Sequence, residues 1–257
     1  MLVAAVGDST LRDIWTMLIT ILGESRNLTR RPVITGHRHR YLNATLPPSS
    51  ARQPRIDFAF QYIPGVQAAT LPLPEPVCPT KWWKASSWSR AVQAQSAIER
   101  LVGEQHEQQQ QQQRWQHTLL LYGGIQQSLP SGRSIGELAR GMASCFPGVK
   151  LVVKSAHPAV TVMSPSNSSH SWPLPGRAAA LRHALRLDSE VSPALEGTAA
   201  AWWDVSPILR AASKSLIVGS PLCMCHYVNS VNRELARSVL ASEWWRAWWR
   251  EAGAGVW

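Results

Sequence analysis

The sequence predicts an α/β protein, with a three-layer α/β/α fold around a central, mostly parallel sheet. Short apolar runs alternate with segments whose apolar residues recur at helical spacing. Several of these runs end at glycine or at a polar residue, which is typical of buried parallel strands that lead into loops. With 257 residues, 45% of them hydrophobic, the chain can form one large core. We therefore expect a single domain that spans residues 1–257.

The first strand is expected at residues 1–6, and it ends at Gly7-Asp8-Ser9. A helical pattern begins at once, with apolar residues at 11, 14, 15, 18, 19 and 22. Ser9 should therefore lie at the carboxyl end of a buried strand, where open α/β sheets bind their ligands. On the tripeptide alone, a turn with a helix-capping serine is the simpler interpretation.

The remaining elements follow from the same patterns. Strands are expected at 32–36, 55–63, 117–122, 148–154 and 199–205, and helices at 86–102, 134–145, 176–187 and 227–249. Residues rich in proline, serine or asparagine indicate loops at 46–54, 71–79 and 163–175. The glutamine-rich segment 104–116 is predicted to be a low-complexity insertion without chemistry of its own.

The segment 244–250 pairs tryptophans four residues apart. Such pairs stack along one face of a helix. Tryptophans also bind sugars and membrane surfaces, but helix packing is the favoured interpretation.

The distribution of charge and the spacing of possible metal ligands limit the classes of partner and ligand that we expect. The net charge of +10 favours a polyanionic partner, but the arginines are scattered rather than clustered as a nucleic-acid-binding protein requires. His37 and His39 have no third ligand nearby, and a solvated basic turn is favoured over a metal site. We therefore expect no nucleic acid, no metal and no cofactor.

The four cysteines, Cys78, Cys145, Cys223 and Cys225, are too few for a disulfide scaffold. The sequence has neither a signal peptide nor an apolar run that would span a bilayer. Because the chain begins inside its first strand, we expect a missing N-terminal extension, and association with a membrane only through an anchor in that extension.

Nucleophilic catalysis by a serine needs a base, an orienting carboxylate and oxyanion donors. Several expected strand ends carry such residues, and the carboxyl ends of parallel strands share one edge of a sheet. His226 is the preferred base for Ser9 because it precedes the last helix, and His157 is its rival. Asp204 follows another expected strand.

Four segments in this order resemble the SGNH (GDSL-type) hydrolases. They are Gly-Asp-Ser-Thr-Leu-Arg at 7–12, Leu-Tyr-Gly-Gly-Ile-Gln at 121–126, Trp-Asp-Val at 203–205 and Cys-His-Tyr at 225–227. Within that superfamily they look most like the PC-esterase branch, which includes trichome-birefringence-like, capsule-structure-like and neurexophilin-and-PC-esterase-like proteins. The resemblance covers roughly residues 1 to 250.

The resemblance implies an SGNH-hydrolase or flavodoxin-like fold and an acyl-enzyme mechanism. Ser9 would be the nucleophile and an oxyanion donor, and His226 would be the general base. Gly65, which fits slightly better than Gly36, and Gln126 would complete the oxyanion hole. The implied activity is that of a serine esterase or O-acyltransferase on O-acetyl or other short acyl esters of a carbohydrate, in the Golgi or outside the cell. The basic charge favours an acidic glycan.

One departure from the PC-esterase pattern concerns the catalytic acid. Members carry Asp-x-x-His, whereas this chain has Cys223 three residues before His226. A neutral thiol neither holds the imidazole tautomer nor stabilises the imidazolium. Three alternatives remain open: Asp204 supplies the carboxylate, Ser9 and His226 act as a dyad, or the chain is a catalytically degenerate domain that binds a glycan or a protein. Cys223 or Cys225 could equally form a disulfide that fixes this loop.

Overall fold

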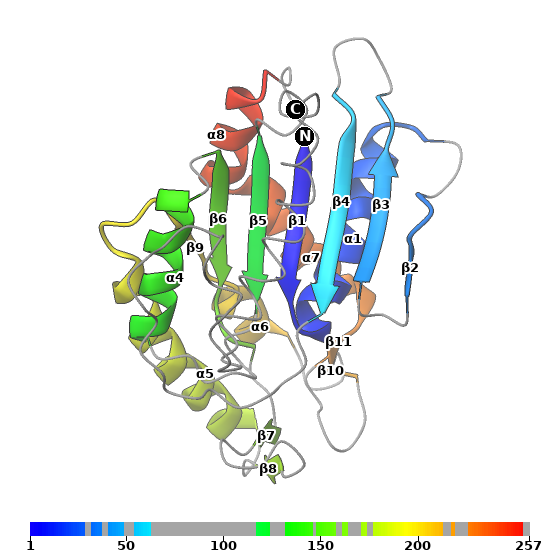
Figure 1. Cartoon of the computed structure of the whole chain (residues 1–257). Coiled ribbons are helices and arrows are strands. Elements are labelled where there is room, and N and C mark those ends of the chain that lie inside the picture. The colour runs from blue at the N-terminus through cyan, green and yellow to red at the C-terminus, as the bar shows by residue number, and fades with distance from the viewer. Residues whose placement is uncertain are drawn as a thin grey trace.

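The computed structural model describes residues 1–28, 32–37, 41–48, 54–62, 117–123, 132–145, 148–157, 161–163, 171–173, 177–212, 217–218 and 226–253. In these ranges a seven-stranded sheet lies between two layers of helices (Figure 1). The expected three-layer α/β/α architecture with a mostly parallel sheet is confirmed.

The sheet has the strand order β2-β3-β4-β1-β5-β6-β9. Strand β1 (Leu2–Gly7) lies between β4 (Ile56–Tyr62) and β5 (Thr118–Gly123) and runs parallel to both. Strands β6 (Val149–Lys154) and β9 (Ala201–Trp203) continue the parallel part beyond β5. On the other side, β3 (Tyr41–Leu46) and β2 (Thr35–His37) are antiparallel.

The chain leaves β1 toward one side of the sheet, to build β2–β4, and later returns to its other side to build β5, β6 and β9. The carboxyl end of β1 is therefore a topological switch point. At such points the loops of neighbouring strands separate and leave room for a ligand. Ser9 follows β1 at this position.

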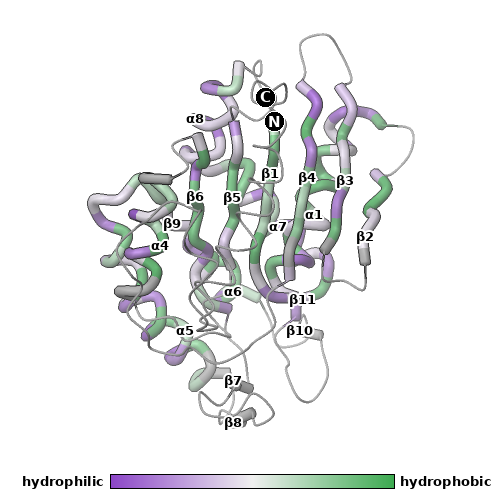
Figure 2. The backbone as a smooth tube through the Cα atoms, in the orientation of Figure 1, coloured by the Kyte–Doolittle hydropathy of each residue, from purple (hydrophilic) through white to green (hydrophobic). Residues whose placement is uncertain are grey.

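Helices cover both faces of the sheet. Helices α1 (Ser9–Ser25), α6 (Ser206–Ala211), α7 (Asn229–Ala241) and α8 (Glu243–Glu251) pack on one face, and α4 (Gly132–Cys145) and α5 (Arg177–Val191) on the other. Strand β1 contributes to both cores, because Val3 and Ala5 belong to the first and Leu2, Ala4 and Val6 to the second. The hydropathy of the central strands in Figure 2 reflects this burial on both sides.

Three small elements complete the described chain. Strand β7 (Thr161–Met163) pairs with β8 (Ser171–Pro173), and η3 (Pro193–Leu195) follows α5. Strand β10 (Ile217–Val218) pairs antiparallel with β11 (His226–Tyr227) beside the end of α1 that bears Ser9. Within the described ranges, no helix is both long and apolar enough to cross a bilayer.

Two sequence-based expectations need correction. The strand expected at 32–36 is β2 at Thr35–His37, and residues 41–46, for which no element was expected, form β3. The basic turn expected around His37 and His39 falls mainly on residues 38–40, which lie outside the described residues. The single helix expected over 227–249 is two helices, because Ser242 is extended at φ −70° and ψ 149° and its side chain accepts a hydrogen bond from the backbone N of Trp245. The helix expected at 86–102 and the insertion at 104–116 lie outside the described residues.

The tryptophans of α8 pack in the core, as expected from their spacing. Trp245, Trp248 and Trp249 are all buried, and the Trp245 and Trp249 rings stack at 5.8 Å between centroids. They belong to the cluster that joins α1 and α7 to the sheet. Helix α8 therefore uses its tryptophans for internal packing rather than as an exposed aromatic surface.

Candidate active site

The turn between β1 and α1 presents Ser9 at the first position of the helix. Asp8 is the N-cap residue: its Oδ1 accepts hydrogen bonds from the backbone N of Thr10 (2.9 Å) and of Leu11 (3.2 Å) and from Thr10 Oγ1 (2.6 Å). Because Asp8 satisfies these donors, the Ser9 hydroxyl is not needed as a cap. The simpler interpretation of Ser9 as the capping residue is therefore corrected.

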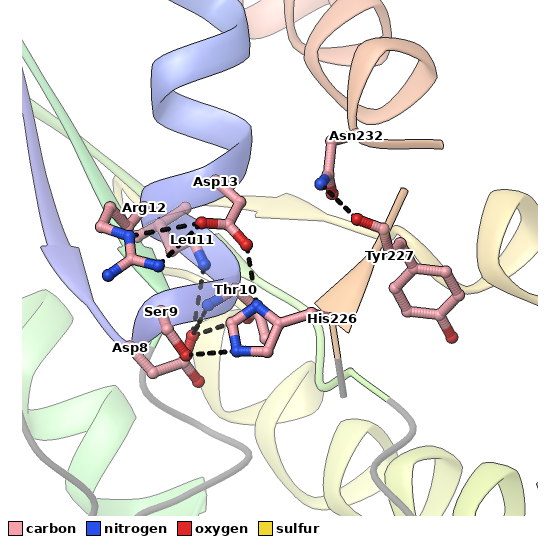
Figure 3. Close-up of polar contacts among 9 residues, drawn as sticks. All are labelled: Asp8, Ser9, Thr10, Leu11, Arg12, Asp13, His226, Tyr227 and Asn232. Carbon is pink, nitrogen blue, oxygen red and sulfur yellow. Dashed lines mark hydrogen bonds and ion pairs between the residues drawn. The ribbon is translucent and has the colours of Figure 1, made fainter. Parts of the chain in front are cut away.

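The Ser9 hydroxyl is hydrogen-bonded to the imidazole of His226. Ser9 Oγ lies 3.0 Å from His226 Nε2, although the two residues are 217 positions apart in the sequence (Figure 3). His226 is held by β11 just before α7, with 23% of its side chain exposed. The structure thus brings together the two residues that the sequence proposed as nucleophile and base.

The other ring nitrogen of His226 contacts a carboxylate that the sequence analysis did not select. His226 Nδ1 lies 2.7 Å from Asp13 Oδ2 (Figure 3). Asp13 is one helical turn after Ser9 on α1, so both side chains project from the same face. An Nδ1–H that donates to Asp13 leaves Nε2 free to accept the Ser9 proton, which is the tautomer that a general base needs.

The orientation of Asp13 is itself fixed by Arg12. Arg12 Nη2 and Nε donate to Asp13 Oδ1 at 3.0 and 3.3 Å, while Oδ2 faces His226. Each carboxylate oxygen therefore has its own partner. Ser9, His226 and Asp13 form a line of hydrogen bonds with the geometry of a Ser-His-Asp triad.

Asp204 does not occupy the position expected for it. It is exposed after β9, and its Oδ1 accepts a hydrogen bond from the backbone N of Ser206 (2.8 Å), which shapes the start of α6. The carboxylate at His226 Nδ1 belongs to Asp13. The expectation that Asp204 orients the base is therefore corrected: it closes a local turn, as aspartates commonly do.

The other expected oxyanion donors, Gly65 and Gln126, lie outside the described residues, as do Cys78, Cys223 and Cys225. The donor that the described chain does supply is the backbone N–H of Ser9. As the first residue of α1 it has no carbonyl acceptor within its own helix. A helix N-terminus also favours negative charge, such as that of a tetrahedral oxyanion.

His157, the rival base, is engaged elsewhere. It is buried, and its Nδ1 lies 2.8 Å from Lys154 Nζ. Burial, the charge of Lys154 and that of His226 keep the pKa of His157 well below its usual value. Among the hydrogen bonds of the described residues, the contact to Ser9 Oγ comes from His226, so the geometry favours His226 as the base.

Lys154 and Asp188 join His157 in a group of ionisable side chains, of which Lys154 and His157 are buried and Asp188 is partly exposed. Burial lowers the pKa of Lys154 to about 8, against the opposing attraction of Asp8 and Asp188. Burial likewise raises the pKa of Asp188 to about 6. Asp188 accepts hydrogen bonds from the backbone N of Ala156 (2.8 Å) and from Ser206 Oγ (3.3 Å). Neither Lys154 nor Asp188 was selected from the sequence.

Within the described residues, no cluster of three or more His, Cys, Asp and Glu side chains could hold a metal ion. Searches of protein-family models and of curated proteins found no match to this sequence.

Proposed function

We propose that this protein is a serine esterase or O-acyltransferase that acts through an acyl-Ser9 intermediate. The observation that carries the proposal is the continuous line from Ser9 Oγ through His226 to Asp13, with contacts of 3.0 and 2.7 Å. The line lies at the switch point of a mostly parallel α/β sheet. The SGNH and PC-esterase motifs noted in the sequence support the same reaction class.

The arrangement accounts for each proton of a double displacement. His226 Nε2 accepts the Ser9 proton as Oγ attacks the ester carbonyl, and the imidazolium is stabilised by Asp13. The tetrahedral intermediate collapses when His226 returns the proton to the leaving alkoxide, which leaves the acyl group on Ser9. His226 then deprotonates water or an acceptor hydroxyl, which attacks the acyl carbonyl. Collapse of this second intermediate releases Ser9, which recovers its proton from His226.

Asp13 removes the main objection to catalysis. The cysteine at position 223 leaves the Asp-x-x-His pattern without its acid, but a carboxylate reaches the same imidazole nitrogen from α1. Neither the unassisted dyad nor Asp204 is then required. The degenerate glycan- or protein-binding domain remains the second candidate, and the departure at Cys223 is the observation in its favour.

The proposed substrates are O-acetyl or other short acyl esters of a carbohydrate, and the proposed site of action is the Golgi or the extracellular space. Both proposals rest on the resemblance to PC-esterases. The net charge of +10 supports an acidic glycan, because it attracts polyanions over long distances.

Labelling by a fluorophosphonate probe and turnover of p-nitrophenyl acetate test the proposal. We expect the wild type to react in both assays and Ser9→Ala to react in neither. Ser25→Ala is the matched control, since Ser25 is an exposed serine on the same helix and should leave both signals unchanged. A wild type that is neither labelled nor active contradicts the enzymatic proposal and favours the binding domain.

A further inference from the structure

Gly123 leaves room for the buried Lys154 near the first turn of α1. Gly7 pairs with Gly123 at the carboxyl ends of β1 and β5. Tyr122 pairs with Val153, so Lys154 follows at the corresponding end of β6. A Cβ atom at Gly123 would lie 3.1 Å from Lys154 Cε and 3.0 Å from Leu11 Cβ. Lys154 Cε and Leu11 of the first turn of α1 therefore lie close to the same side of Gly123.

The Lys154 ammonium has defined partners. It donates to Ser155 O (2.9 Å) and lies 2.8 Å from His157 Nδ1. Because an ammonium can only donate, His157 accepts through Nδ1 and carries its own proton on Nε2. Lys154 thus selects the tautomer of His157.

Two carboxylates face the Lys154 charge, Asp8 from the β1–α1 turn and Asp188 from α5. Asp8 is 1% exposed, and its buried Oδ2 has no hydrogen-bond partner among the residues that the structure describes. A buried carboxylate oxygen in that state needs a nearby positive charge. The ammonium of Lys154 provides it, and so stabilises the N-cap that fixes Ser9.

A second chain of contacts leads from Lys154 to the catalytic base. The His157 ring packs edge-on against the Tyr227 ring, with centroids 5.5 Å apart. Tyr227 is buried, its carbonyl accepts a hydrogen bond from Asn232 Nδ2 (2.8 Å), and it directly follows His226. The position of His157 therefore constrains β11 and with it the imidazole that faces Ser9.

We propose that Lys154 is a positioning residue for acyl transfer. Its ammonium balances the charge of Asp8 at the first turn of α1 and orients His157 against β11, so that Ser9 and His226 are held at hydrogen-bonding distance. The inference rests on the proposed function, since it concerns the geometry of that same site. It predicts that the reaction needs Lys154 in its charged form.

The consequence is a loss of activity on the alkaline side. Lys154 has a pKa of about 8, because burial disfavours its charge, and it therefore becomes neutral at mildly alkaline pH. Asp188 and His157 do not titrate in that range: the pKa of Asp188 is about 6, and that of His157 is well below its usual value. Ester hydrolysis by Ser9, His226 and Asp13 alone has no step that would fail at mildly alkaline pH.

The test compares wild type, Lys154→Met and Lys154→Arg between pH 6.5 and 9.5. The fluorophosphonate labelling rate and p-nitrophenyl acetate turnover are measured, with spontaneous hydrolysis subtracted. We expect the wild type to lose activity above about pH 8, as Lys154 releases its proton. Below about pH 8, Lys154→Met should have a kcat about 10²-fold lower than the wild type, with little change in KM, because the reacting groups are misplaced; above that pH the two rates should converge. Lys154→Arg keeps its charge and should restore activity without the alkaline loss.

Lys150→Met is the matched control, because Lys150 is a partly exposed lysine on the same strand and should behave as the wild type. If Lys154→Met is labelled at the wild-type rate and with the wild-type pH profile, the inference is wrong and the proposed function is unaffected. Absence of any wild-type reaction contradicts both. If the variants fail to fold, the wild-type profile still decides: a rate that does not fall between pH 7 and 9.5 overturns the inference.

Discussion

Asp13 and Asp204 are assigned different roles, and substituting each of them by asparagine tests the difference. Asp13 contacts His226 Nδ1, whereas Asp204 accepts a hydrogen bond from the Ser206 backbone. Asp13→Asn should preserve the packing but favour the wrong imidazole tautomer, and by analogy with triad aspartates should lower kcat by about 10³–10⁴-fold. Asp204→Asn should retain close to wild-type turnover. Steady-state hydrolysis of p-nitrophenyl acetate measures both, and a similar loss in the two variants would contradict the assignment.

The sequence allowed Ser9 and His226 to be proposed because each lies at the end of an expected strand or the start of an expected helix. Asp13 carried a signal as well, since it lies four residues after Ser9 on an expected helix, and such residues share a face. The Asp-x-x-His pattern directed attention to residues before His226 instead. Lys154 could not be found in this way, because its role depends on the register that places it beside Gly123.

At the level of elements, the central strands were predictable because they are buried on both faces and so are continuously apolar. Strand β3 was missed, although its apolar and polar residues alternate, because it lies between a basic segment and a proline-rich one. The break between α7 and α8 was hidden as well, because the helical pattern of apolar residues continues through Ser242. Side-chain capping by a single serine decides that boundary.

Substitution of Gly123 tests how tightly α1 packs against the sheet. A Cβ atom there would crowd Leu11 and Lys154 at 3.0 to 3.1 Å, so Gly123→Ala should lower the free energy of unfolding by about 1–3 kcal/mol. Gly141→Ala is the opposite case, because its Cβ would meet no described atom within 4 Å and α4 gains a better helix former. It should raise stability by about 0.5–1 kcal/mol. Urea denaturation measures both, and a stabilising Gly123→Ala would show that the turn is loosely packed.

For the whole molecule, the burial of Lys154 has a thermodynamic consequence that is independent of catalysis. Its pKa is about 8 in the folded protein, compared with 10.5 for a lysine in water. Between these two pKa values the unfolded chain binds more protons than the folded one, so this group makes the free energy of unfolding rise as the pH rises from about 8 to 10.5. Its contribution over that window is at most about 3 kcal/mol.

This stability effect and the proposed catalytic effect have opposite signs, which makes their combination diagnostic. Loss of the Lys154 proton should reduce acyl transfer while it removes the free-energy cost of a buried charge. Relative to Lys154→Met, wild-type protein should therefore become more stable in urea denaturation between pH 7.5 and 9.5, while its turnover falls. Other titrating groups are common to both chains and cancel in the difference. If the wild type instead loses stability relative to Lys154→Met over this range, its loss of activity at alkaline pH is caused by unfolding. Lys154 is then not a buried cation whose charge destabilises the fold.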